Sequence, residues 1–244
     1  MNIHINKNAA ELGKAAGIKA AGIIRAAIAA RGNANIILAT GASQFATLDQ
    51  LVIEEEIAWN KVTMFHLDEY IGLPVTHAAS FRKYLQERFL DRVAPLQAVF
   101  LINGEKDALA ECRLLAAAIG THPVDLALAG IGENGHLAFN DPPADFETTA
   151  PYIIVSLDLA CRKQQLGEGW FASLEEVPLQ AISMSVQQLM QSKHIICSVP
   201  DSRKALAVKN TVMLPVSHLN PASILQKHPA CDLYLDSASA ALLT

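Results

Sequence analysis

The hydrophobic positions of this chain alternate between long segments with helical spacing and short segments that are apolar throughout. Residues 9–31 are rich in alanine, and their larger apolar side chains recur at the spacing of one helical face. Residues 34–40 then form a short apolar run between Gly32 and Gly41, which predicts a buried strand.

The same alternation continues to the end of the chain. It predicts further strands at residues 62–67, 99–102, 125–129, 153–157, 181–186, 194–199 and 232–235. It predicts further helices at residues 44–56, 79–90, 107–119, 187–193 and 203–212. Fully apolar strands separated by helices are typical of a mostly parallel sheet covered on both faces. We find no linker or repeat, and therefore expect one α/β domain over residues 1–244, an open Rossmann-like sheet with helices on both faces.

Composition narrows the classes of function. The 244 residues carry 19 Lys+Arg against 24 Asp+Glu, which disfavours a general nucleic-acid surface but leaves room for one small phosphorylated ligand. The apolar runs are far shorter than the ~20 residues of a membrane-spanning helix, so we expect no membrane partner. Four scattered cysteines, without a Cys-x-x-Cys pair, indicate free thiols in a reducing compartment. Charged residues interrupt the N-terminal segment, which does not resemble a signal peptide, and we expect a cytoplasmic protein.

Ligands of parallel sheets bind beyond the carboxyl ends of the strands, so residues directly after strands are candidates for a site. The first such group is Thr40, Gly41, Ala42 and Ser43, between a predicted strand and a predicted helix. Small residues at a helix N-terminus can form a cradle for an anion. The alternative is an ordinary turn in which Ser43 caps the helix.

A second group follows the strand at residues 62–67. Asp68 and Glu69 come directly after this apolar run. A partly buried carboxylate at such a position can act as a general base, because burial raises its pKa. The alternative is a turn that exposes two acids to solvent.

The richest group is the segment 130–142, which follows the strand at residues 125–129. It contains three glycines, which permit tight turns, together with Asn134, His136 and Asp141. A histidine between an amide and a carboxylate can be oriented by one and made more basic by the other. We therefore interpret this segment as functional rather than as the setting of a structural histidine.

Two cations stand near the ends of later predicted strands. Arg162 follows the strand at residues 153–157, and Lys204 opens a helix after the strand at residues 194–199. Arginine binds phosphate in a bidentate manner and lysine as a point charge. Taken alone, each residue is more often an ordinary surface charge.

These motifs, taken in order, resemble the glucosamine-6-phosphate deaminase (isomerase) family, which is related to the 6-phosphogluconolactonases. The resemblance spans nearly the whole chain and rests on TGAS (40–43), FHLDEYIGLP (65–74), GIGENGHLAFNDP (130–142), Arg162, SRKALAV (202–208) and PASILQKHP (221–229). The segments DEYIGLP and GHLAFNDP are its specific signals.

The resemblance implies a role for each candidate residue. Residues 40–43, Arg162 and Lys204 would hold the 6-phosphate of the sugar. His136, assisted by Asn134 and Asp141, would open the pyranose ring. Asp68 would move a proton from C2 to C1, giving fructose 6-phosphate and ammonia without a metal or an organic cofactor.

The chain departs from the family at two of these positions. Asn134 stands where the family often has Asp, and Asp141 is one methylene shorter than the usual Glu. An amide cannot offset the positive charge of an imidazolium, so we expect His136 to be a weaker base. The shorter Asp141 is expected to alter the geometry of ring opening.

The resemblance also carries expectations about regulation and assembly. Regulated members of the family have basic residues shortly after the FNEP motif and a longer C-terminus, whereas residues 142–152 here contain no Lys or Arg. We therefore expect no amino-sugar allosteric site, and a monomer. Residues 164–178 would form a lid over the site; the alternative is a packed, irregular connection.

Two other functions remain as alternatives. A 6-phosphogluconolactonase would share the scaffold, but that branch typically shows Ser-Asp-Glu-Arg in place of LDEY and a GHTASLFP-like segment in place of GHLAFNDP. A non-catalytic sugar-phosphate sensor would keep the pocket without efficient chemistry. Only the departures at Asn134 and Asp141 favour the sensor.

Overall fold

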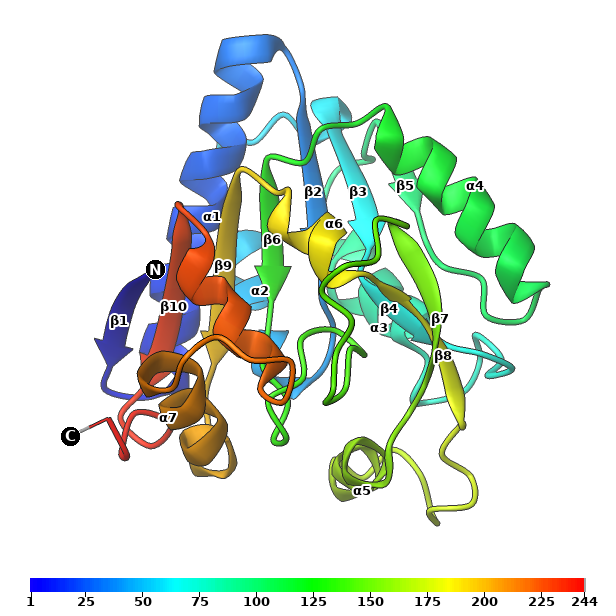
Figure 1. Cartoon of the computed structure of the whole chain (residues 1–244). Coiled ribbons are helices and arrows are strands. Elements are labelled where there is room, and N and C mark those ends of the chain that lie inside the picture. The colour runs from blue at the N-terminus through cyan, green and yellow to red at the C-terminus, as the bar shows by residue number, and fades with distance from the viewer. Residues whose placement is uncertain (244) are drawn as a thin grey trace.

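The computed structural model describes residues 1–243 and contains one seven-stranded sheet whose neighbouring strands are all parallel. The strand order is β1-β10-β9-β6-β2-β3-β5. The strands are β1 (Asn2–Asn6), β2 (Ala34–Leu38), β3 (Val62–His66), β5 (Ala98–Phe100), β6 (Leu126–Ala129), β9 (His194–Val199) and β10 (Cys231–Asp236) (Figure 1). The predicted mostly parallel sheet is confirmed.

Helices cover both faces of this sheet because its strands are apolar on both sides. Ile36 and Leu38 of β2 pack toward α1 (Ala9–Arg31), α2 (Phe45–Leu51) and α3 (Phe81–Arg88). Ile37 of the same strand belongs to the opposite core, which includes residues of the helices α4 (Ala108–Gly120), α6 (Val186–Met190) and α7 (Ala205–Met213). The remaining helix, α5 (Leu159–Gly167), lies to one side of the main sheet (Figure 1).

The alanine-rich first helix is explained by close packing against α2. A Cβ atom at Gly13 would come within 2.2 Å of the Ala46 side chain, and one at Gly17 within 2.6 Å of Gln50. The helix begins after Asn8, whose side chain accepts a hydrogen bond from the Glu11 N–H at 2.9 Å. It ends at Gly32, whose φ of 83° favours glycine.

A second, antiparallel sheet was not separated from the first in the sequence pattern. It consists of β4 (Asp68–Tyr70), β8 (Gln180–Met184) and β7 (Tyr152–Ser156), in that order. Leu67 joins the two sheets, because its N–H donates to Leu38 of β2 while its carbonyl accepts from Met184 of β8. The run predicted as one strand at residues 62–67 is therefore followed by a second short strand that carries Asp68.

The two ends of the described chain meet at one edge of the main sheet. β1 pairs in parallel with β10. Most residues of β1 are exposed, so the hydrophobic pattern of the sequence did not predict this strand. All four cysteines are buried and free. Among residues 1–243, no helix has both the length and the apolar character needed to cross a membrane.

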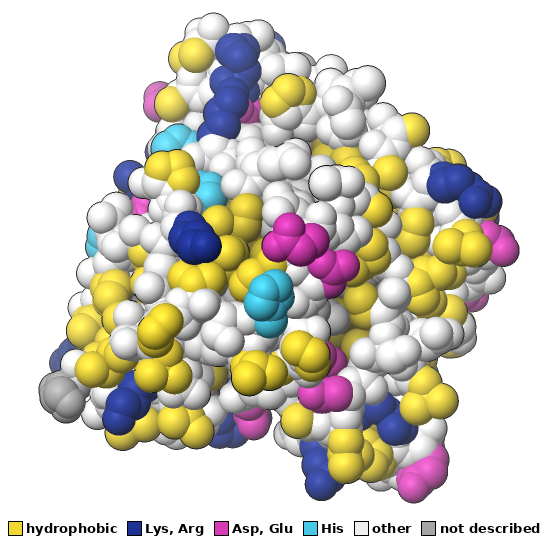
Figure 2. Space-filling model, viewed as in Figure 1, with side chains coloured by type: hydrophobic (Ala, Val, Ile, Leu, Met, Phe, Trp, Pro, Cys, Tyr) yellow, Lys and Arg dark blue, Asp and Glu magenta, His cyan; other side chains and the backbone are white. Residues whose placement is uncertain are grey.

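The direction of the strands places the candidate segments together. The strands of the main sheet run downward in Figure 1, so the connections that follow them gather at the lower end, where α5 and α7 also lie. On the face shown in Figure 2, charged side chains of both signs are dispersed among apolar ones and form no extended basic surface.

Candidate active site

A cavity of about 300 Å³ opens at the carboxyl ends of the strands. It brings together the residues 40–43, Asp68, His136 and Lys204, which the sequence had singled out from four separate segments. The other lining residues include Phe81, Gly130, Ile131, Gly132, Ala138, Phe139, Gln164, Gln165, Glu168, Asp201 and Arg203.

The loop 40–43 forms one wall of this cavity. Gly41 has a φ of 90° and a ψ of 168°, a conformation that essentially only glycine adopts, so the turn requires this residue. The Tyr84 hydroxyl donates to the Gly41 carbonyl at 3.1 Å, and the Gln44 amide donates to the Ala129 carbonyl at 2.9 Å. These contacts fix a glycine-containing loop that is suited to an anion.

Lys204 enters the same cavity from the 3₁₀ turn Ser202–Lys204, which follows β9. Its side chain is buried, and burial lowers its pKa, opposed by the charges of Glu168 and Glu133. No hydrogen bond or ion pair joins its ammonium group to any of residues 1–243. The group can therefore bind an anionic ligand without first losing a partner.

Arg203 is a cation of this cavity that the sequence interpretation did not single out. Its guanidinium is paired with Asp201 at 2.9 Å and with Glu133 at 3.4 Å. The signal for it was present, since Arg203 lies inside the SRKALAV segment beside Lys204.

Asp68 opens to the cavity from β4, and its carboxylate accepts no hydrogen bond from any of residues 1–243. Only 7% of the residue is exposed. Burial raises the pKa of Asp68 to about 8, and the charge of the neighbouring Glu69 adds to the effect. A carboxyl group in this state can take up a proton near neutral pH and hold it.

His136 faces the cavity with its Nδ1 turned to a carboxylate behind it. Nδ1 donates to Asp141 Oδ1 at 3.1 Å, which leaves Nε2 as the ring nitrogen free to act on a ligand. The Asn134 amide donates to the same Asp141 oxygen at 3.0 Å, and its carbonyl accepts from the His136 N–H at 3.1 Å. The imidazole is thereby oriented through the backbone and through Asp141.

Asn134 and Asp141 are not among the lining residues of the cavity and act from behind His136. Burial raises the pKa of Asp141, but the hydrogen bonds from His136, Asn134 and the Asp158 N–H, with the charge of His136, lower it overall. Asp141 is thus kept ionised. The amide at position 134 donates to this carboxylate, a contact that an ionised Asp at that position could not make.

Close packing explains why two positions of the segment 130–142 are glycine. A Cβ at Gly132 would lie 2.3–2.4 Å from three atoms of the His136 ring, and one at Gly130 would lie 2.9 Å from the Ser43 hydroxyl. The ring of His136 therefore rests directly on the backbone of Gly132, whose N–H also donates to the His136 carbonyl at 3.0 Å.

The structure does not bring Arg162 to the cavity. Its guanidinium donates to the carbonyls of Leu174 and Val177, at 3.3 Å for the latter, and so holds the connection after α5. In this structure Arg162 therefore does not line the cavity beside Lys204, since its donors are committed to backbone acceptors of the partly exposed turn at residues 174–177. Its expected contact with the phosphate stays a prediction.

The segment 164–178, predicted as a lid, forms a side of the cavity in this structure. Gln164, Gln165 and Glu168 line it, and Phe171 packs edge-on against Tyr70. These lining residues were missed as individual candidates, because an α5 side chain reaches the cavity only through the way this helix packs.

One group of potential metal ligands adjoins the site. The ligand atoms of His136, Asp141 and Cys161 lie within 4.8 Å of one another. Burial raises the pKa of the Cys161 thiol far above its usual range, and His136 Nδ1 is already bonded to Asp141. This donor set suits a hydrogen-bonded cluster better than a metal, which prefers a thiolate.

Comparison with known proteins identifies the family of this chain. The sequence profile of the glucosamine-6-phosphate isomerases/6-phosphogluconolactonase family matches residues 7–233. A glucosamine-6-phosphate deaminase of Lactobacillus delbrueckii subsp. bulgaricus is 34% identical over 244 residues, covering 100% of both chains. A glucosamine-6-phosphate deaminase of Streptococcus pneumoniae serotype 4 is 36% identical over 215 residues, covering 88% of this chain and 90% of its own.

Solved structures indicate the same family. A structure described as a monomeric glucosamine-6-phosphate deaminase superposes with a TM-score of 0.91 at 29% identity, covering 99% of this chain and 100% of its own. A putative 6-phosphogluconolactonase of Neisseria gonorrhoeae shares the fold, with a TM-score of 0.77 at 18% identity and coverage of 97% and 99%. The chain belongs to the glucosamine-6-phosphate isomerase/6-phosphogluconolactonase family.

Proposed function

We propose that this protein converts glucosamine 6-phosphate and water to fructose 6-phosphate and ammonia. The observation that carries the proposal is that one cavity holds Asp68, a carboxyl group with a raised pKa, and His136, an imidazole oriented by Asp141. The deaminase relatives, matched over the full length of the chain, support the same substrate.

Each group of residues that lines the cavity has one task in the proposed reaction. The loop 40–43 and Lys204 bind the phosphate of the sugar. His136 Nε2 opens the ring by moving a proton between O5 and O1. Asp68 then breaks the C2–H bond and returns the proton to C1, which leaves an imine at C2. Water adds to this imine and ammonia departs.

We also propose that the enzyme acts as a monomer in the cytoplasm. The monomeric deaminase with a TM-score of 0.91 supports the first statement, and four buried free thiols support the second. Neither the proposed steps nor the proposed residues require a metal or an organic cofactor.

The test is an ammonia assay on the purified protein with a panel of hexosamine 6-phosphates. We expect stoichiometric ammonia and fructose 6-phosphate from glucosamine 6-phosphate. Hydrolysis of 6-phosphogluconolactone without ammonia release would instead indicate the lactonase activity of the wider family. Sugar-phosphate binding with neither reaction would indicate a sensor.

A further inference from the structure

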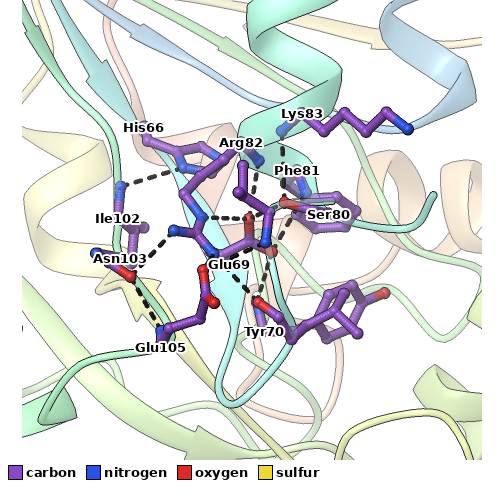
Figure 3. Close-up of polar contacts among 12 residues, drawn as sticks. His66, Glu69, Tyr70, Ser80, Phe81, Arg82, Lys83, Ile102, Asn103 and Glu105 are labelled. Carbon is purple, nitrogen blue, oxygen red and sulfur yellow. Dashed lines mark hydrogen bonds and ion pairs between the residues drawn. The ribbon is translucent and has the colours of Figure 1, made fainter. Parts of the chain in front are cut away.

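Asp68 has a neighbour in the chain, Glu69, that the proposed reaction does not use. The residue is fully buried and is held by four donors (Figure 3). Oε1 accepts from the N–H groups of Tyr70 at 2.9 Å and Phe81 at 3.3 Å. Oε2 accepts from the Arg82 N–H at 2.8 Å and the Ser80 hydroxyl at 3.0 Å.

Arg82 closes this cluster on the far side of Glu69. Its Nε lies 3.5 Å from Glu69 Oε2, and its side chain is buried. The rest of the guanidinium donates to Asn103 at 3.0 Å, to the Leu73 carbonyl at 3.1 Å and to Glu105 at 2.7 Å. Three separate segments therefore fix the buried carboxylate of Glu69 in β4 and the buried guanidinium of Arg82 next to it (Figure 3).

The hydrogen bonds indicate the ionised form of Glu69. Burial raises the pKa of Glu69, and that pKa stays above its usual value overall, although the backbone donors of Arg82, Tyr70 and Phe81 and the hydroxyl of Ser80 lower it. Every neighbouring contact to its oxygens comes from a donor, and a protonated carboxyl would need an acceptor. A carboxylate with several N–H donors remains charged even when buried.

Among the groups around Asp68, Glu69 is the charged one that most directly affects the pKa of Asp68. Tyr70, Tyr152 and Cys161 also lie close enough to feel the charge of Asp68, but burial raises their own pKa values and keeps them neutral. His136 lines the same cavity as Asp68, and Arg82 lies beyond Glu69. An ionised Glu69 therefore opposes ionisation of Asp68 through a medium that screens little.

We propose that Glu69 is a positioning residue of the reaction, whose buried charge makes Asp68 retain the proton taken from C2 until that proton is returned to C1. The inference rests on the proposed function. A carboxyl group of ordinary acidity would lose this proton to water before transfer. Arg82 and the first turn of α3 serve to keep Glu69 ionised and in place.

The first experiment compares Glu69→Gln with the intact enzyme, using glucosamine 6-phosphate deuterated at C2. We expect the acid limb of the kcat/KM profile to move by about one unit to lower pH. The share of deuterium recovered at C1 should fall at least twofold while KM changes little. Arg82→Lys keeps the buried charge and should leave the acid limb in place. Equal loss of kcat at every pH, with an unmoved limb and unchanged deuterium transfer, would overturn the proposal.

A second measurement does not depend on the folding of a variant or on turnover. Carboxyl ¹³C NMR of the intact protein should show Glu69 ionised throughout pH 6–9 and Asp68 titrating well above the usual aspartate range. A protonated Glu69 at pH 7 would overturn the proposal. Absence of ammonia release with these NMR results would instead refute the proposed function alone.

Discussion

Asp68 and Asp141 are two aspartates of one site whose surroundings affect their pKa values in opposite directions. Asp68 accepts no hydrogen bond within residues 1–243, and burial raises its pKa to about 8. The side chain of Asp141 is also buried, but the donors of His136, Asn134 and Asp158 lower its pKa overall. A pair separated in this way indicates two roles: Asp68 exchanges a proton, and Asp141 carries a fixed charge.

Local backbone structure produces the difference. β4 is a three-residue strand that presents Asp68 to the cavity while its neighbours Glu69 and Tyr70 enter the protein interior. The segment 130–142 instead folds back on itself, so that the side chains of Asn134 and His136 converge on Asp141, and the N–H of Asp158, just before α5, adds a backbone donor. Burial without donors makes a base, and burial with donors makes a stable anion.

Removing the proton acceptor should have the largest effect. Asp68→Asn keeps the size of the side chain but cannot take the C2 proton, so kcat should fall by about 10³-fold with little change in KM. Exchange of the C2 hydrogen with solvent, followed by NMR, should disappear. Undiminished exchange in this variant would remove Asp68 from the proposed role.

Replacing the fixed charge should have a smaller effect. Asp141→Asn removes the carboxylate that accepts from Nδ1 of His136, so the wrong tautomer competes and kcat should fall about 10²-fold. Asp141→Glu, which restores the length usual in the family, keeps the charge and serves as the control. If both variants lose the same activity, geometry rather than charge explains the role of Asp141.

A substitution that crowds the His136 ring should disturb its contact with Asp141 and leave the pKa of Asp68 unchanged. Gly132→Ala places a Cβ within 2.4 Å of the His136 ring, which must shift, and kcat should fall about tenfold or more. The acid limb that reports Asp68 should stay in place. Gly22→Ala is the matched control, because a Cβ there meets nothing within 4 Å. Equal activity of the two variants would contradict the contact.

Substitution of the cation proposed to bind the phosphate should weaken substrate binding and leave the pKa values of Asp68 and Asp141 unchanged. Lys204→Met removes the unpaired ammonium, so KM should rise about tenfold or more while the pH limbs stay fixed. Arg162→Lys tests the residue that the structure places elsewhere. It should loosen the connection at residues 174–177 with a smaller change in KM, and a KM change equal to that of Lys204→Met would return Arg162 to the phosphate.

The sequence was most informative where a single segment carries the signal. Apolar strands identified the main sheet, and the segments around Asp68 and His136 identified the two acid–base groups of the proposed reaction. It was least informative where contacts join distant segments. Neither the second sheet nor the commitment of Arg162 to Leu174 and Val177 can be read from local periodicity.

The side chains supplied by α5 illustrate the same limit. Gln164 is an ordinary polar residue of a short helix and Glu168 directly follows that helix, and only the packing of the helix against the cavity gives them a place in the site. The amide of Asn134 is a similar case. The weaker base expected at His136 stays a prediction, and the donation of the Asn134 amide to Asp141 depends on how the segment 130–142 folds back on itself.

The smallest expected effect is on stability, and it has opposite signs at the two aspartates. The pKa of Asp68 is raised in the folded protein, so its ionisation opposes folding increasingly from about pH 4 to about pH 8. Asp68→Asn should therefore raise the free energy of unfolding by roughly 1–3 kcal/mol at pH 9 and change it little at pH 4.

The pKa of Asp141 is lowered, so its charge stabilises the fold above about pH 4, and this contribution is lost as pH falls through the folded pKa. Asp141→Asn should lower the free energy of unfolding at neutral pH, with a difference that shrinks in acid. Urea unfolding of both variants at pH 4, 7 and 9 measures these signs. Destabilisation of Asp68→Asn at pH 9 would mean that Asp68 has a stabilising partner, and the contrast between the two carboxylates would then fail.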